Sequence, residues 1–344
     1  MISFQKHIEQ TNLYPFTLLR DTSDLFSGAF TNKERWTAAA NCFQLPELHN
    51  VPANLIPYFD FWKTCKQYGL NHSLEQSNDY TMIQHKWDYI QQNEKLITSD
   101  IQLLKLMNTF QPLPEHLNIT GDKSEIYIEE GATIEQATIN TTSGPVYISK
   151  DALIMDGACL RGPIFIGRSA VVKMGAMIYG GSSIGEKAIV GGEIKNSIIS
   201  SFSNKAHDGY LGDSIIGEWC NLGAGTTVSN LKNNASDVEL WNMHDGIFET
   251  AGKKCGTFMG DFSRTGINTS LNTGTVIGIC SNIVPVNRLT PKFVPNFTWF
   301  HDQMSTYLLD KAFLDIQNWM SFKEKELTPE CKNKLISIFN SENL

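Results

Sequence analysis

The feature that most constrains this chain is an aliphatic residue at every sixth position through residues 148–190. The eight positions are Ile148, Ile154, Leu160, Ile166, Val172, Ile178, Ile184 and Val190. A small residue stands four positions after most of them, as Ala152 does after Ile148. An α-helix repeats every 3.6 residues, and a helix with this much glycine would lose about 1 kcal/mol for each one. The period therefore excludes a helical middle region.

A strict period of six predicts a solenoid. Side chains alternate every two residues along a strand, so a period of six indicates short strands separated by corners of fixed length. The aliphatic residue points inward and the small residue fits a crowded corner. Three units complete a triangular coil, and coils stack at the strand spacing of roughly 4.8 Å. We therefore predict a mainly β chain built on a parallel β-helix. Its phase resumes at Ile216 and again at Met259.

Glycine divides the chain into three zones, since 23 of the 26 glycines lie between Gly131 and Gly278. We predict a small N-terminal domain over 1–115, α/β or helical, because apolar residues recur there at helical spacing. The β-helix is predicted over 116–298. Residues 299–344 are predicted to form a helical cap, with Thr328 capping a last helix that begins at Pro329. These helices would cover an end of the solenoid.

Two interruptions of the period fall at residues 196–210 and 231–254. Interruptions in a solenoid become loops that project from one face, and such loops often form binding sites. We expect the first to carry catalytic residues. The second is long enough to reshape or block an acceptor pocket.

Composition narrows the classes of function. The net charge is −8 and no long basic run is present, which disfavours nucleic acid and anionic membranes as partners. No stretch approaches the roughly 20 apolar residues of a membrane span, and no secretory signal is visible. The seven cysteines are scattered and form no Cys-x-x-Cys pair, as in reduced cytosolic proteins. We expect a cytoplasmic protein.

His207 is the first candidate for chemistry. A histidine on a solenoid loop can take a proton from an amine nucleophile near neutral pH. Asp208 or Asp213 could orient it. Taken alone, His207 could equally be a solvated loop residue.

The surrounding motif favours the catalytic interpretation. Lys205, His207, Tyr210 and Asp213, followed by the run Asn-Leu-Gly-Ala-Gly-Thr at 221–226, resemble the acetyltransferase domain of GlmU-type bifunctional enzymes. Nearly the whole chain resembles the GlmU-like sugar nucleotidyltransferase family of Bacteroidetes. The matching runs include 13–36, 144–163, 203–234, 272–278 and 293–300.

The resemblance implies a left-handed β-helix, a homotrimer with substrate clefts between neighbouring β-helices, and acetyl-CoA as co-substrate. It makes His207 the catalytic base, with Asp208 beside it. The residues implied to hold a sugar phosphate or nucleotide sugar are Arg161, Lys173, Lys205, Tyr210, Asn221, Asn230 and Lys232. Backbone at Gly223, Ala224 and Gly225 would border the cofactor, and an N–H near Gly223 or Ala224 could stabilise the thioester oxyanion.

The N-terminal region departs from that family. Nucleotidyltransferases open with a glycine-rich loop of the L-x-x-G-x-G-T-R type that wraps the nucleotide phosphates, and this N-terminus has none. Neither GxGxxG nor GxxxxGK[ST] is present either. The nearest remnants are residues 15–20, with Thr31 and Lys33. We expect a reduced nucleotidyltransferase-like domain that serves oligomer contacts or binds a sugar nucleotide.

The favoured hypothesis is acetyl transfer from acetyl-CoA to an amino-sugar phosphate or nucleotide-linked amino sugar. One alternative is sugar-1-phosphate nucleotidyl transfer, as in UDP-N-acetylglucosamine synthesis, with Mg²⁺. Another is a non-catalytic trimeric scaffold that binds a sugar nucleotide. A β-helical carbonic anhydrase needs three histidine ligands, and the β-helix zone offers only His207 and His244, so no metal site is predicted.

Overall fold

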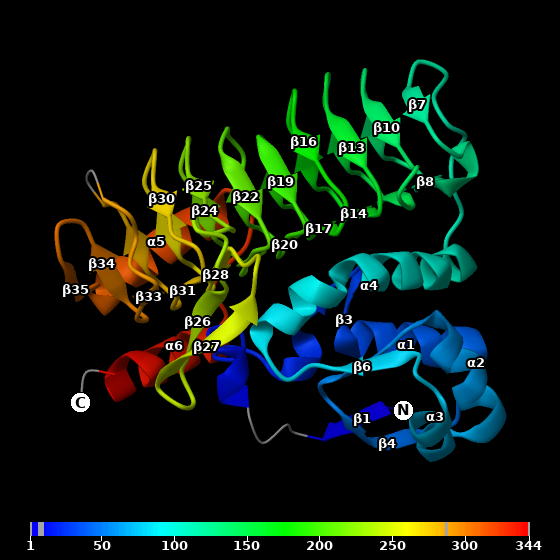
Figure 1. The fold of residues 1–344 in the computed structure, drawn as a ribbon, viewed down its shortest axis with the longest axis horizontal. Helices are drawn as coiled ribbons and strands as arrows, with labels where there is room; N and C mark the ends of the chain where they lie inside the picture. The colour runs from blue at the N-terminus through cyan, green and yellow to red at the C-terminus, as the bar shows by residue number, and fades with distance from the viewer. Residues whose placement is uncertain (1, 6–9, 286–287, 343–344) are drawn as a thin grey trace.

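The computed structural model describes residues 2–5, 10–285 and 288–342. A parallel β-helix lies along one side of the molecule, a small N-terminal domain packs beneath it, and the C-terminal helices cover its last coils (Figure 1). This confirms the predicted mainly β fold class, with a β-helix, an N-terminal domain of mixed α and β structure, and C-terminal helices. No helix in the described ranges is long and apolar enough to cross a membrane.

The β-helix has three faces, each a parallel sheet. The first face contains β7 (Asn118–Thr120), β10 (Thr138–Asn140), β13 (Cys159–Arg161), β16 (Met177–Ile178), β19 (Glu193–Lys195) and β22 (Tyr210–Gly212). The second contains β8 (Ile126–Ile128), β11 (Val146–Ile148), β14 (Ile164–Ile166), β17 (Ser182–Ile184), β20 (Ile198–Ile199), β23 (Ile215–Ile216), β28 (Thr257–Met259), β31 (Thr275–Ile277) and β33 (Phe293–Val294).

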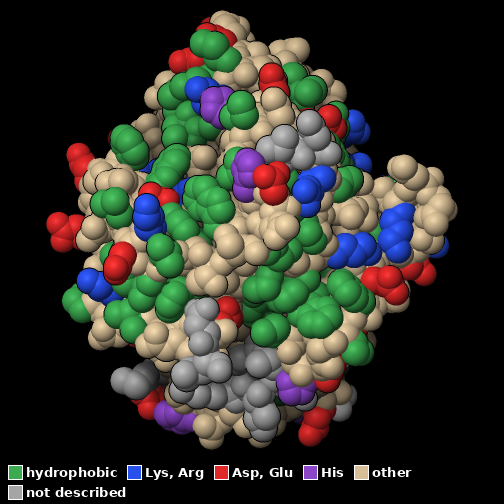
Figure 2. Space-filling view, turned by 90° about the vertical axis from the view of Figure 1, so that its left-hand side faces the viewer, with side chains coloured by type: hydrophobic (Ala, Val, Ile, Leu, Met, Phe, Trp, Pro, Cys, Tyr) green, Lys and Arg blue, Asp and Glu red, His purple; other side chains and the backbone are tan. Residues whose placement is uncertain are grey.

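The third face contains β9 (Thr133–Ile134), β12 (Leu153–Ile154), β15 (Val171–Val172), β18 (Ile189–Val190), β21 (Asn204–Lys205), β24 (Asn221–Leu222), β29 (Arg264–Thr265), β32 (Asn282–Ile283) and β34 (Thr298–Phe300), with β35 (Met304–Thr306) antiparallel at its edge. A separate parallel pair is formed by β25 (Thr227–Val228) and β30 (Ser270–Leu271). Figure 2 views the end where β34 and β35 lie, and hydrophobic side chains gather there.

The predicted inward positions form the core of the β-helix. All eight aliphatic residues of the period from Ile148 to Val190 are at most 1% exposed. They belong to one continuous apolar cluster that runs from Leu117 to Phe300. Burying each such side chain contributes about 1.5–3 kcal/mol relative to leaving it in water. The stacked inward residues therefore hold the coils in register.

The corner between the second and third faces explains where the C-terminal helices dock. One residue per coil turns this corner with a left-handed φ of 48–65°: Asp151, Ser169, Lys187, Phe202, Trp219, Phe262, Cys280 and Phe297. The early corners are polar and the later ones are mostly aromatic. The later ones pack against α5 (Leu309–Ser321) and α6 (Pro329–Glu342). As predicted, α6 begins at Pro329, and the Cys331 amide donates to Thr328 Oγ1 at 3.2 Å.

The N-terminal domain combines four helices with short strand pairs. The helices are α1 (Asn32–Phe43), α2 (Phe59–Tyr68), α3 (Leu70–Gln76) and α4 (Lys86–Met107). The strand pairs are β1 (Ile2–Gln5) with β4 (Leu48–Pro52), β2 (Phe26–Ser27) with β3 (Phe30–Thr31), and β5 (Leu55–Pro57) with β6 (Tyr80–Met82). Short 3-10 turns are η1 (Gln10–Leu13), η2 (Thr22–Asp24) and η3 (Lys123–Glu125).

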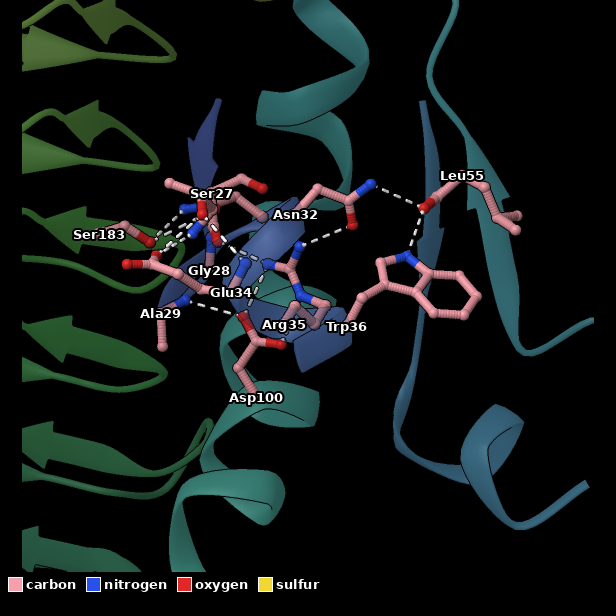
Figure 3. A network of polar contacts seen from close by, with 12 residues as sticks. Ser27, Gly28, Ala29, Asn32, Glu34, Arg35, Trp36, Leu55, Asp100 and Ser183 are labelled. Carbon is pink, nitrogen blue, oxygen red and sulfur yellow. Dashed lines mark hydrogen bonds and ion pairs between the residues drawn. The ribbon is translucent and has the colours of Figure 1, made fainter. Parts of the chain in front are cut away.

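A buried ion pair organises the N-terminal domain (Figure 3). The side chains of Arg35 on α1 and Asp100 on α4 are each 1% exposed, and Arg35 Nε donates to Asp100 Oδ1 at 2.8 Å. Arg35 Nη2 donates to Asp100 Oδ2 and to the Ser27 carbonyl. The Ala29 amide also donates to Asp100. The network fixes the turn between β2 and β3 against two helices.

Asn93 extends this network to the β-helix. It accepts from the Gly28 amide and donates to the Gly181 carbonyl at 2.7 Å and to Ser183 Oγ on β17 at 3.0 Å. The side chain of Asn93 is fully buried. The domain is therefore joined to the second face by buried hydrogen bonds as well as apolar contacts.

The interruption at 231–254 forms an antiparallel hairpin, β26 (Val238–Asn242) and β27 (Ile247–Gly252). Its side chains share an apolar cluster with the N-terminal domain. The buried Lys86 donates to the Trp241 carbonyl at 2.7 Å, and Gln91 donates to the Ala251 carbonyl at 3.4 Å. The hairpin thus fastens α4 to the β-helix.

The ion pair gives a stability prediction. Asp100→Ala leaves a buried guanidinium without its carboxylate, so we expect the free energy of unfolding to fall by about 3–5 kcal/mol. Asp60→Ala is the control, because it breaks the Asp60–Lys63 pair, whose side chains are 66% and 60% exposed. The control should change stability little. Urea unfolding followed by tryptophan fluorescence measures both, and equal losses would contradict a special role for the buried pair.

Candidate functional site

One corner of the β-helix is shorter than its neighbours. The inward residues Val172 and Ile178 are six positions apart, whereas Val190 and Ile194 are only four apart, and all four are buried. Gly191 and Gly192 make this short corner, and Gly192 has a left-handed φ of 70°. A Cβ at Gly191 would lie 2.6 Å from the Ala206 carbonyl oxygen. The corner therefore sits back from the corners on either side of it.

The recessed corner is the floor of a cleft of about 560 Å³ between the third and first faces. The corner after β15 forms one wall and the corner after β21 forms the other. The cleft is lined by Lys173, Met174, Gly191, Gly192, Ala206, His207, Asp208, Ala224, Gly225, Ile267 and Asn268. It brings together five predicted site residues: Lys173, His207, Asp208, Ala224 and Gly225.

The expectation of a projecting loop at 196–210 is wrong. This segment forms β20 and β21 and continues the coil into β22. The inward positions are Ile199, Lys205 and Leu211, again six apart and all buried. The spacing of six is hard to see in the sequence because a lysine, Lys205, occupies the inward position that pairs with Val190 on the neighbouring strand. His207 therefore lies on a corner of the solenoid, exposed to solvent.

Lys205 supports the His207 corner from inside the coil. Its side chain is 1% exposed, and its ammonium donates to the Gly191 carbonyl at 3.0 Å and to the His207 carbonyl at 2.5 Å. It thus links the floor of the cleft to the His207 wall through the space left by the short corner. Burial away from water lowers the pKa of Lys205 to about 8. The side chain points away from the cleft, so the structure does not bring it to the predicted substrate position.

Tyr210, Asn230 and Lys232 lie outside the cleft. The Asn230 amide donates to the Tyr210 hydroxyl at 3.0 Å and to Asp213 Oδ2 at 2.5 Å. Burial and the Asp213 carboxylate raise the pKa of Tyr210 to about 12. Lys232 is half-exposed, in the segment that leads into β26. Asp213 therefore engages Asn230 and Asn196 rather than His207.

Arg161 leads a polar strip on the first face. Strand pairing aligns Leu160 with Ile178 and Ile178 with Ile194, so the next residues, Arg161, Tyr179 and Lys195, stand on successive rungs. The next rung is Gly212 on β22, the strand that also carries Tyr210. Tyr179 and Lys195 were missed from sequence. Tyr179 directly follows the inward Ile178, so the hexad register could have found it, whereas Lys195 follows Ile194, which the short corner shifts out of that register.

Asn221 and Gly223 are engaged elsewhere. Asn221 stands on the third face between Asn204 and Arg264 and accepts from Asn204 Nδ2 at 3.5 Å. The Gly223 amide donates to Thr265 at 3.0 Å, and the Gly225 amide donates to the Asp208 carbonyl at 3.2 Å. Of the two predicted oxyanion donors, Gly223 is therefore already paired, and Ala224 lines the cleft.

The remnants proposed for the nucleotidyltransferase motif make structural contacts. Arg20 pairs with Asp261 at 2.6 Å and with Glu218 at 3.1 Å, both on the β-helix. Thr31 caps α1, where its hydroxyl accepts from the Glu34 amide. Lys33 is 63% exposed and lies 3.9 Å from Asp24. Arg20 thus fastens the domain to the β-helix, Thr31 caps a helix, and Lys33 lies at the surface.

Comparison with known proteins finds relatives for part of this chain, although no family model matches. A bifunctional sugar-1-phosphate nucleotidylyltransferase/acetyltransferase of Sulfurisphaera tokodaii is 38% identical over 99 residues, 28% of this chain and 24% of that protein. The bifunctional protein GlmU of Methanocaldococcus jannaschii is 40% identical over 86 residues, 25% of this chain and 21% of that protein. This chain thus spans about a quarter of their length.

Solved structures with some likeness include the polysialic acid O-acetyltransferase OatWY, 13% identical, with a TM-score of 0.29 over 55% of this chain and 88% of that one. Arabidopsis UDP-N-acetylglucosamine acyltransferase is 13% identical, with a TM-score of 0.27 over 68% and 91%. The sequence matches confirm the resemblance: over those segments this chain is similar to GlmU-type nucleotidyltransferase/acetyltransferases.

Lys205 gives a prediction on pH dependence. Its pKa is about 8 in the folded chain against an ordinary 10.5, so between these values the unfolded chain holds a proton that the folded chain has lost. Stability attributable to Lys205 therefore rises with pH across this window, by up to about 3 kcal/mol. We therefore expect the free energy of unfolding of the wild type to increase relative to that of Lys205→Met as the pH rises from about 8 to 10.5.

Urea unfolding at several pH values measures this difference. Other groups titrate in both proteins and cancel in the comparison. Lys150→Met, at an exposed corner residue, is the control and should follow the wild type at every pH. A constant difference between wild type and Lys205→Met would contradict a buried, titrating ammonium.

Proposed function

We propose that this chain is an acyltransferase that moves an acetyl group from acetyl-CoA to the amine of an amino-sugar phosphate or nucleotide-linked amino sugar. The observation that carries the proposal is the cleft in which His207 and Lys173 face each other across a glycine floor. An exposed histidine on a corner fixed from inside by Lys205 is suited to proton transfer. The similarity to nucleotidyltransferase/acetyltransferases supports the same class of reaction.

His207 acts as general base in this proposal. The acceptor amine attacks the thioester carbonyl and forms a C–N bond while His207 takes the amine proton. The C–S bond then breaks, and the proton passes from His207 to the leaving thiolate, which departs as the CoA thiol. The Ala224 amide is the candidate donor to the oxyanion. Asp208, next to His207 at the cleft, is the candidate to orient the imidazole.

Phosphate and sugar recognition is assigned to the cations and polar groups around the cleft. Lys173 would meet a phosphate at the wall opposite His207. Arg161, Tyr179 and Lys195 form a strip on the first face that could hold the rest of a charged acceptor. Tyr210 and Asn230, already hydrogen-bonded to each other, offer further polar contacts.

We also propose that a second copy of the chain closes the cleft, as in a homotrimer. Met174 and Ile267 line the cleft and are 67% and 73% exposed. Large apolar side chains at the mouth of a polar cleft are typical of a surface that another subunit covers. Nucleotidyl transfer with Mg²⁺ is not favoured, because Arg20 and Thr31 are taken up by contacts within the chain.

The test is thiol release from acetyl-CoA in the presence of glucosamine-1-phosphate. We expect acceptor-dependent release by the wild type, and a fall in kcat/KM of about 10²–10⁴-fold in His207→Ala, the range for losing a general base. His244→Ala is the matched control, since it removes an exposed histidine from the turn between β26 and β27. Loss of activity in both variants, or no release across several amino-sugar phosphates, would contradict the proposal.

A further inference from the structure

A second cleft of about 620 Å³ lies where the end of α5 meets the third face. Its floor is formed by outward residues of three neighbouring strands, Val171 on β15, Ile189 on β18 and Asn204 on β21. Trp319 and Phe322, at the end of α5, form its wall. The lining is mostly apolar, and none of the site residues predicted from sequence belongs to it.

The two aromatic residues of this cleft differ in how they are held. Trp319 is half-buried, and the Arg264 guanidinium stacks on its ring at 5.6 Å. Phe322 is 80% exposed, with its ring centroid 6.0 Å from that of Trp319. A phenylalanine this exposed at the rim of an apolar cleft presents a ring face on which a planar ligand can stack.

Cations stand beside the aromatic wall. Lys323 donates to the Lys187 carbonyl and, at 3.2 Å, to Asn204 Oδ1, which holds its ammonium at the edge of the cleft. The Lys187 side chain also lines the cleft, and so does Glu324, so the lining carries one net positive charge. An aromatic face beside two ammonium groups is the combination that binds a base and a phosphate together.

The second cleft lies beside the His207 cleft on the third face. Val171, Ile189 and Asn204 line the second cleft, and Lys173, Gly191 and Ala206, two residues further along the same strands, line the first. Two residues of extended chain span about 6.6 Å. The residues between them, Val172, Val190 and Lys205, point inward, so the outward-facing residues that line the two clefts are next to each other on this face.

We propose that the second cleft holds the nucleoside-phosphate end of a ligand whose reacting end lies at His207. The base would stack on Phe322 and the phosphate would meet Lys187 and Lys323. This inference rests on the proposed acyl transfer, because both acetyl-CoA and a nucleotide-linked sugar carry a nucleoside phosphate. The nucleoside phosphate is the shared chemistry, and the two sources are separated by experiment.

The test compares dissociation constants by calorimetry for two pairs of probes: CoA against pantetheine, and UDP-N-acetylglucosamine against N-acetylglucosamine-1-phosphate. Within each pair only the first member carries the nucleoside. Phe322→Ala should weaken the nucleoside-bearing probe about tenfold or more, the effect of losing one stacking contact, and leave its partner unchanged. Leu314→Ala is the control, since Leu314 is 57% exposed on the same helix and does not line the cleft.

The outcomes separate the sources. If Phe322→Ala weakens the binding of CoA alone, the occupant of the second cleft is the co-substrate. If it weakens the binding of UDP-N-acetylglucosamine alone, the occupant is the acceptor. No binding of either nucleoside-bearing probe, or equal affinities in wild type and Phe322→Ala, overturns the inference. Binding is measured without turnover, so failure of acyl transfer would not be mistaken for failure of the subsite. Unchanged thermal unfolding of Phe322→Ala verifies that the variant is folded.

Discussion

This structure depends on one constraint: on each of its three faces, every coil of the β-helix must place one side chain in the core. Aliphatic residues meet it almost everywhere, and the strands they anchor are only two or three residues long. The corner between Val190 and Ile194 is two residues shorter than the corner between Val172 and Ile178 in the preceding coil. The shorter corner leaves space in the interior and a recess at the surface. Lys205 occupies this space with a charged group that bonds the cleft floor and the His207 wall. The candidate site and the buried Lys205 thus have the same structural origin.

The rest of the molecule covers the other surfaces of the β-helix. The second face is buried by the N-terminal domain, which is held through Asn93, Arg20 and the hairpin of β26 and β27. The corner between the second and third faces is covered by α5 and α6 over its aromatic residues. The first face and its corner with the third remain exposed, and the His207 cleft opens there. The additions to the solenoid thus leave this cleft accessible.

Much of this fold could be predicted from sequence, because hexad spacing reports the inward positions directly. Ile148 to Val190 were placed correctly for that reason. Lys205 was not, because its position becomes visible only when Ile199 and Leu211 are counted on either side of it. The contacts within the N-terminal domain could not be predicted from the sequence either. Arg35 and Asp100 are 65 residues apart, and nothing local in the sequence pairs them. Arg20 and Thr31 were recognised only as remnants of a nucleotidyltransferase motif, and the tertiary structure uses them for docking and capping.

The way His207 is held determines what it can do. Lys205 bonds the carbonyl of His207 and not its ring, so it fixes the backbone that carries the exposed imidazole without occupying a ring nitrogen. The ammonium of Lys205 lies inside the coil, close behind the cleft floor. The protein interior screens a charge less than water does, so this ammonium acts more strongly on groups bound in the cleft. A positive charge there stabilises the negative charge that develops on a bound thioester or that a phosphate carries. The interior lysine therefore supports both the geometry of this corner and the binding of anionic groups in it.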